Sequence, residues 1–263
     1  MPARLYLGTS GFKFDDWAGA FYPPGLNERE WLTYYGTQFN ALEVNASYYT
    51  LFSPRTFFFM ARKVPDDFQF TVKCFKSLTH DRTDNAQDFT AFRASLDPLL
   101  EAQKFGCVVA QFPHSFHDTP ENRQYLDHFI KQFTGLALVV EFRGREWATD
   151  EVLDFLRERQ AGYICVDEPP LKSLMPPLAV ATSPVGYVRF HGRNAREWYS
   201  GDGKKRYDYL YTPDELGEWV PRIERLWEDT SRLYIFMNNC YMGKATRNAL
   251  QLREMLQREL PLG

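Results

Sequence analysis

The sequence predicts an α/β protein of the (β/α)8, TIM-barrel type, formed as a single domain by residues 1–263. Two observations predict this class. Short apolar, β-rich runs alternate along the chain with longer stretches of helical periodicity, which is typical of parallel strands connected by helices. The length of 263 residues also suits one barrel, because such barrels commonly run to about 250 residues.

Eight candidate strands follow one another, and most are separated by enough chain for a helix. Several are almost continuously apolar, as expected of strands that are covered on both faces. They are residues 5–10, 41–47, 68–74, 106–112, 136–142, 162–166, 186–191 and 233–238. A closed barrel is favoured over an open, doubly wound sheet, because Gly8-Thr9-Ser10-Gly11 lacks the GxGxxG pattern that usually marks the open fold.

Start signals mark several connecting helices. Ser53-Pro54, Thr119-Pro120 and Thr212-Pro213 each combine a capping side chain with proline at the first helical position. Glu215 adds a capping box to the third of these, which predicts a helix with Trp219 on its apolar stripe. Residues 168–184 instead carry five prolines, so we expect an irregular sixth unit with an extended loop in place of a full helix.

Composition excludes several classes of function. A net charge of −3 argues against a broadly basic nucleic-acid-binding protein, although a local basic patch stays open. No apolar run approaches the roughly 18 residues of a membrane span, so we expect no membrane partner. The four cysteines form no CxxC pair, and no signal peptide is evident, so a reduced, cytoplasmic protein is expected.

Polar side chains stand at or just beyond the carboxyl end of every candidate strand. These ends meet at one face of a barrel, which is where barrel enzymes have their active sites. The second strand is followed by Tyr48, and His80 lies in the loop after the third. The other candidates are Glu43, Asn45, Lys73, Gln111, Glu141, Arg143, Asp167, Arg189, His191, Arg193, Asn238 and Asn239.

Strand alternation predicts which of these side chains share a face. Residues two apart point to the same side of a strand, so Glu43 should accompany Asn45, Glu141 should accompany Arg143, and Arg189, His191 and Arg193 should form a third set. Buried polar groups are costly unless they pair or face a ligand. A structural Glu–Arg network that plugs the barrel is therefore the alternative to a binding site.

The loop after the seventh strand is basic and aromatic over residues 189–206, and it contains Trp198. Arginine forks suit phosphate or carboxylate, and aromatic faces stack on sugars or bases. Loops after the seventh and eighth strands of a barrel often hold phosphate. The sequence therefore predicts a small anionic ligand here, and the alternative is a solvated basic loop.

Our first hypothesis is an enzyme that acts by acid/base chemistry on a small anionic, polyhydroxylated ligand, such as a sugar phosphate or nucleotide. Glu43 or Glu141 would act as general acid or base, and His191 would transfer a proton. Cationic side chains would hold the anion, and asparagines would bind hydroxyl groups. Further ligand-binding candidates are Asn45, Tyr48, Lys73, His80, Gln111, Arg143, Asp167, Arg189, Arg193, Trp198, Asn238 and Asn239.

Two alternatives stay open. One is a metal-dependent phosphodiesterase or nucleic-acid repair enzyme, because carboxylates and histidines suit zinc or manganese. Its ligands would come from Glu43, His80, Glu141, Asp167 and His191. The other is a non-catalytic module that binds nucleic acid or a protein. No cofactor is required by the sequence, a divalent metal is compatible with it, and the oligomeric state is open.

Taken together, the short sequence blocks that contain these strand-end residues resemble the domain-of-unknown-function-72 (YecE-like) family. The resemblance runs in order along nearly the whole chain, and its most specific blocks are Glu141-Phe142-Arg143 and Arg189-Phe190-His191-Gly192-Arg193. It implies a TIM-barrel-like fold but no established reaction. The family usually has an acidic residue where Cys240 stands, so a metal site that used that carboxylate is less well supported here.

Overall fold

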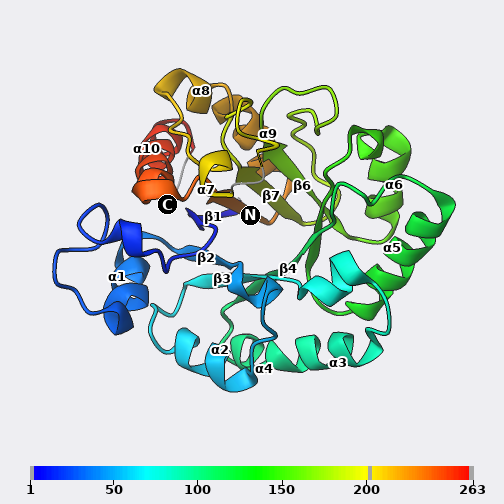
Figure 1. The fold of residues 1–263 in the computed structure, drawn as a ribbon, viewed down its shortest axis with the longest axis horizontal. Coiled ribbons are helices and arrows are strands. Elements are labelled where there is room, and N and C mark those ends of the chain that lie inside the picture. The colour runs from blue at the N-terminus through cyan, green and yellow to red at the C-terminus, as the bar shows by residue number, and fades with distance from the viewer. Residues whose placement is uncertain (1–2, 201–202, 261–263) are drawn as a thin grey trace.

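In the computed structural model, which describes residues 3–200 and 203–260, eight parallel strands form the ring that the sequence predicts. Helices cover the outside of this ring, with α5 and α6 on one side and α1 and α10 on the other (Figure 1). The strands are β1 (Arg4–Thr9), β2 (Ala41–Val44), β3 (Gln69–Lys73), β4 (Phe105–Gln111), β5 (Leu138–Glu141), β6 (Gly162–Asp167), β7 (Val185–Phe190) and β8 (Arg232–Met237).

The connecting helices begin where the capping signals place them in three cases, at Pro54, Pro120 and Pro213. The capping box of Thr212 and Glu215 is present. The helices are α1 (Trp31–Gln38), α2 (Pro54–Ala61), α3 (Ala86–Ser95), α4 (Asp97–Glu101), α5 (Pro120–Gln132), α6 (Asp150–Glu158), α7 (Gly203–Arg206), α8 (Pro213–Gly217), α9 (Val220–Asp229) and α10 (Lys244–Glu259).

Two local expectations can be compared with the structure. The proline-rich segment after β6 contains no helix between Asp167 and Val185, which confirms the irregular sixth unit. The helix expected to run on through Trp219 is instead divided into α8 and α9. Pro221 stands in the first turn of α9, where its missing N–H costs no helical hydrogen bond, so a second helix can begin there.

The barrel closes between β1 and β2 with help from side chains. The only bridge between these two strands in the described chain joins Ser10 to Glu43. Below it, the buried hydroxyl of Tyr35 accepts from the Thr9 N–H at 2.8 Å and donates to the Ala41 carbonyl at 3.1 Å. A side chain of α1 thus satisfies backbone groups that a ladder would otherwise pair.

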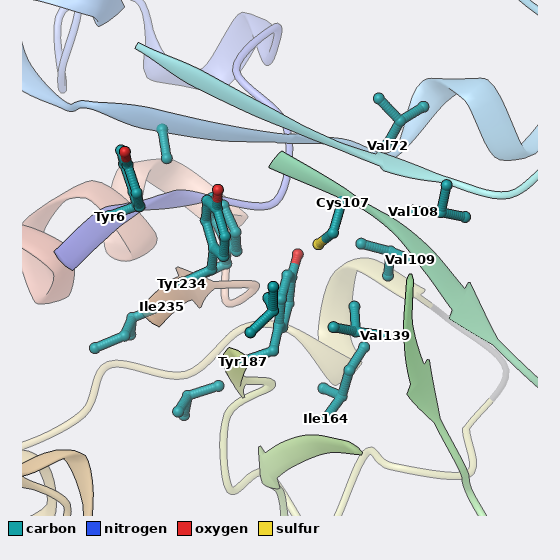
Figure 2. Packing of buried hydrophobic residues seen from close by; sticks show 14 of the residues in the cluster. Tyr6, Val72, Cys107, Val108, Val109, Val139, Ile164, Tyr187, Tyr234 and Ile235 are labelled. Atoms are coloured by element: carbon teal, nitrogen blue, oxygen red, sulfur yellow. The ribbon is translucent and has the colours of Figure 1, made fainter. Parts of the chain in front are cut away.

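The core is continuous from the helices to the barrel interior. Tyr187 and Tyr234 extend from β7 and β8 into the barrel toward Cys107 of β4 (Figure 2). Val139 and Ile164 fill the space beside them on β5 and β6 (Figure 2). These large side chains make the lower barrel a packed layer, so the polar residues above it lie on a solid floor. All four cysteines are free and buried.

No helix among the described residues is both long enough and apolar enough to cross a membrane.

Candidate active site

Arg189 is the centre of the buried polar cluster above the tyrosine layer. Its side chain projects inward from β7 and is 1% exposed. One nitrogen, Nη2, donates to Glu43 of β2 at 2.8 Å, and the other, Nη1, donates to Glu141 of β5. The second oxygen of Glu43 accepts from the Tyr187 hydroxyl at 2.7 Å. One arginine therefore pairs with two carboxylates from separate strands.

Glu141 also faces two further basic groups. Its Oε1 lies 2.9 Å from Nη2 of Arg143 and 3.4 Å from Nε2 of His191. Burial alone would raise the pKa of Glu141, but Arg143 and Arg189 outweigh burial and hold that pKa well below its usual range. Glu141 is therefore an anion at neutral pH and a weak base.

His191 is a neutral imidazole in this environment. It is fully buried, and burial is the main reason that its pKa is lowered to about 3, with Arg143 and Arg189 acting in the same direction against Glu141. Its Nδ1 lies 2.9 Å from the side-chain amide of Asn238. A neutral ring can accept from Asn238 at Nδ1 and present an Nε2–H toward Glu141.

Lys73 ends β3 on the open side of this cluster. Its Nζ donates to Oε1 of Gln111 at 2.9 Å and lies 4.6 Å from the centre of the Tyr48 ring. Among the described residues, no carboxylate oxygen lies within 4.0 Å of it. Burial, followed by repulsion from Arg189 and Arg143, lowers the pKa of Lys73 to about 7, although Glu141 and Glu43 oppose this.

Glu168 is a site residue that strand-end reasoning missed, because it begins the proline-rich loop. One of its oxygens accepts from the Met175 N–H at 2.9 Å, and the other lies 3.5 Å from Nη1 of Arg143. Burial raises the pKa of Glu168 to about 7, although Arg143 opposes it. The signal in the sequence was its position directly after Asp167, since neighbours at a strand end face opposite sides.

The rim of the site is formed by the turns that follow β2 and β3. Asn45 lies just past the end of β2 in helical conformation. The strand alternation that was expected to place it on the same face as Glu43 therefore does not reach it. The His80 ring meets the edge of Tyr48 at 4.9 Å. Burial and then Lys73 lower the pKa of His80 to about 4. Oγ of Ser10 and Oδ1 of Asn45 are buried without a hydrogen-bond partner in the described structure.

Asp167 and Arg193 do not join the cluster. The carboxylate of Asp167 points outward, where it accepts from Arg193, from the Tyr211 hydroxyl at 2.7 Å and from the indole of Trp219 at 2.6 Å. The prediction that Arg193 shares a face with Arg189 and His191 was wrong. β7 ends at Phe190, and Gly192 at φ +88° turns the chain, so the strand alternation no longer applies.

Two remaining candidates, Trp198 and Asn239, lie in the basic loop and just past the eighth strand. Trp198 is buried, with its ring centre 6.5 Å from that of His191. The Arg206 guanidinium lies over the Trp198 ring, 5.5 Å from its centre. Asn239 instead turns away from the site and donates to the Tyr209 carbonyl at 2.8 Å. Of the loop, residues 201–202 and the side chain of Lys204 lie outside the described structure.

The described residues do not assemble a metal site. No group of three or more His, Cys, Asp or Glu side chains in this part of the chain is arranged to hold an ion. Glu43 and Glu141 are bound by Arg189, and Asp167 faces away, so the five candidate ligands do not converge. The Arg189 guanidinium contacts the Glu43 and Glu141 oxygens that a metal ion would need.

A cavity of about 730 Å³ lies beside the cluster at the ends of β1 and β8. Its lining combines aromatic, apolar and charged groups, and it includes Tyr207, whose ring centre is 6.4 Å from that of His191. The lining residues are Lys13, Phe14, Asp15, Asp16, Tyr207, Cys240, Tyr241 and Met242. The volume is sufficient for a small metabolite.

Comparison with known proteins identifies the family. Residues 6–262 match the family described as "Protein of unknown function DUF72". This chain belongs to the DUF72 family. The UPF0759 protein YunF of Bacillus subtilis is 31% identical, and the match covers 97% of this chain and 95% of YunF.

Two solved DUF72 structures share the fold over nearly their whole length. A DUF72 protein of Thermotoga maritima is 40% identical and superposes with a TM-score of 0.90. The match covers 97% of this chain and 99% of that one. A DUF72 protein of Enterococcus faecalis is 27% identical and superposes with a TM-score of 0.86. The match covers 96% of this chain and 95% of that one. The family and the barrel are thereby shown, and neither assigns a reaction.

Proposed function

We propose that this DUF72 protein is an enzyme that binds a small anionic, hydroxylated compound, such as a sugar phosphate or nucleotide, and transfers protons within it. The observation that carries the proposal is the state of Lys73. Its protonated form has no carboxylate partner among the described residues, and the Arg143 guanidinium is near enough to repel it. A charge left without a counter-ion in such a place favours an anionic ligand.

Proton transfer is supported by two groups whose pKa values lie near neutrality. Burial lowers the pKa of Lys73 to about 7 and raises that of Glu168 to about 7. General acids and bases work best when their pKa is close to the working pH. The sequence suggests Glu43, Glu141 and His191 as catalytic groups, but the pKa values of Glu141 and His191 lie far from neutrality, which favours a positioning role for these two.

Recognition of hydroxyl groups is supported by buried polar atoms at the ends of β1 and β2. Ser10 Oγ and Asn45 Oδ1 have no hydrogen-bond partner among the described residues. Buried polar groups are nearly always paired, so unpaired ones at a strand end favour a bound ligand or water. Together with Lys73, they provide both donor and acceptor groups for a polyhydroxylated anion.

The test is a thermal-shift comparison of matched ligands, glucose 6-phosphate against glucose and ribose 5-phosphate against ribose. A ligand at about 100 times its dissociation constant stabilises the native state by about 2.7 kcal/mol, which raises Tm by a few degrees. We expect at least one phosphorylated sugar to raise Tm more than its parent sugar. We also expect Lys73→Met to lose that shift.

The matched control is Lys76→Met, which removes an exposed lysine three residues away that lies 4.0 Å from Asp81. It should keep the ligand-induced shift. Equal shifts in the wild type and in Lys73→Met would contradict the assignment of the anion site. No difference between any phosphorylated sugar and its parent would contradict this ligand class.

A further inference from the structure

The amine of Lys73 is placed to act as more than a charge. We propose that Lys73 is a nucleophile that forms an imine with the carbonyl carbon of an anionic aldehyde or ketone. The inference rests on the proposed function, because it names the substrate class for the same site. It differs in requiring a covalent bond between the chain and the ligand.

The contacts of Lys73 set it apart from other lysines of the chain. Lys13 and Lys131 have carboxylate oxygens at 2.8 and 2.6 Å, so their protons are held by ion pairs. Lys73 instead meets the amide oxygen of Gln111 and the face of Tyr48. These two neighbours orient the amine without supplying the full negative charge that would keep it protonated.

The surrounding charges favour the neutral amine. Burial disfavours the ammonium form most, and Arg189 of β7 and Arg143, just past the end of β5, also repel it. Glu141 and Glu43 favour it, but Arg189 contacts both of them.

His80, from the turn after β3, packs against the same Tyr48 ring as Lys73 and is neutral at physiological pH. A pKa near 7 lets the unprotonated amine form at neutral pH, and only that form attacks a carbonyl.

The guanidinium of Arg143 is suited to the anionic part of such a substrate. Its side chain is 13% exposed, with Nη2 at 2.9 Å from Glu141 and Nη1 at 3.5 Å from Glu168. The second of these contacts is long, and burial favours the protonated, neutral form of Glu168. Arg143 therefore has charge to share with a phosphate or carboxylate beside Lys73.

The proposed step balances without any oxidant or reductant. The neutral Lys73 nitrogen adds its electron pair to the carbonyl carbon, and the carbonyl oxygen takes up a proton. The C–O bond then breaks, and that oxygen leaves as water with the two hydrogens of the original amine. A C=N bond joins Lys73 to the substrate, and its protonated form withdraws electrons from the adjacent carbon.

The experiment is reductive trapping on the wild-type chain. The protein is incubated with D-glyceraldehyde 3-phosphate or with D-glyceraldehyde, reduced with sodium borohydride, and mapped by peptide mass spectrometry. We expect modification of Lys73 to approach one per chain. The phosphorylated aldehyde should reach half-labelling at about tenfold lower concentration, as one charge-assisted contact would give. Labelling should rise with pH around 7.

Lys76 on the same chain is the internal control, since it is exposed and close in sequence. Lys73→Arg, checked for folding by circular dichroism, should remove the adduct, and Lys76→Arg should retain it. Labelling of Lys73 no greater than that of Lys76 would overturn the imine. Equal labelling by the two aldehydes would overturn the anionic class of substrate.

The two proposals fail in distinguishable ways. If sugar phosphates raise Tm through Lys73 but no reduced adduct forms there, the imine is overturned and the proposed binding function stands. If neither the thermal shift nor the adduct depends on Lys73, both are overturned.

Discussion

At the scale of single residues, the barrel mouth separates two kinds of buried charge. Glu43 and Glu141 both pair with Arg189, so the three side chains link three strands. Lys73 and Glu168 are less completely paired, and burial moves both pKa values toward neutrality. Groups of the first kind make the site rigid, and groups of the second kind can take up and release protons near neutral pH.

Two buried tyrosines on neighbouring strands test the importance of the first kind. The Tyr187 hydroxyl donates to Glu43 at 2.7 Å, whereas the Tyr163 hydroxyl has no partner in the described structure. Tyr187→Phe should therefore destabilise the fold by about 1.5–3 kcal/mol, the value of a hydrogen bond to a charged group. Tyr163→Phe should be neutral or stabilising. Urea unfolding measures both, and equal losses would contradict the network.

The pKa of Glu168 predicts a pH dependence of stability. Its folded pKa, about 7, is raised above the ordinary value of 4.5. The folded state therefore binds the extra proton between these values, so this stability contribution is complete below about pH 4.5 and is lost as pH rises through 7. Glu168→Gln keeps the acceptor for Met175 and should become more stable relative to wild type as pH rises.

The gain of Glu168→Gln over wild type should reach at most about 3 kcal/mol at pH 8, from the size of the pKa shift. Denaturant unfolding at pH 5 and pH 8 measures it. Glu101→Gln, at an exposed position at the end of α4, is the control and should show no such trend. A constant difference between wild type and Glu168→Gln across this range would contradict the raised pKa.

At the scale of elements, the loop after β7 is held to the outside of the barrel through Arg193, which pairs with Asp167 and Glu218. Asp167, at the end of β6, accepts from Arg193 of the loop, from Tyr211 and from Trp219. The loop carries Trp198 toward His191. The position of an aromatic wall of the site therefore depends on a contact made on the other face of the sheet.

Asp167→Asn should loosen this loop. Loss of one partner from a buried, hydrogen-bonded charge pair costs about 2–5 kcal/mol. We expect faster tryptic cleavage at Arg193 and Arg196 and a lower denaturation midpoint. Asp208→Asn, which breaks the more exposed pair with Lys244, should cost far less. Cleavage rates unchanged from wild type would show that the loop is held in another way.

The elements also show what the sequence could predict. Eight strands and the irregular sixth unit follow from local apolar patterning and proline content, and the structure has both. The placement of Arg193 could not follow, because one glycine with φ +88° ends the alternation from His191. Glu168 was missed for a related reason, since the pattern of its loop does not indicate that it folds back over Arg143. Long-range packing decides both.

At the scale of the whole molecule, the site depends on closure of the ring between β1 and β2. Ser10 and Glu43 meet at this seam, and both belong to the polar cluster or its rim. Below them the strands are joined through the Tyr35 hydroxyl. The close approach requires a residue without a side chain at Gly8, because a Cβ there would lie 2.0 Å from the Ala41 carbonyl oxygen.

Gly8→Ala should therefore force the seam apart and disturb stability and site together. The contact at 2.0 Å is with backbone, which cannot move without shifting β2, and a second contact at 2.7 Å is with the Tyr35 hydroxyl. We expect a loss of more than about 3 kcal/mol, in the range of severe overpacking, or no soluble protein.

Gly217→Ala, where an added Cβ meets nothing within 4 Å, should be neutral or stabilising because alanine favours the α8 helix. Hydrogen exchange at the Thr9 amide measures the seam directly: it should accelerate in any folded Gly8→Ala protein, and an unchanged rate with full stability would show that the barrel closes without this contact.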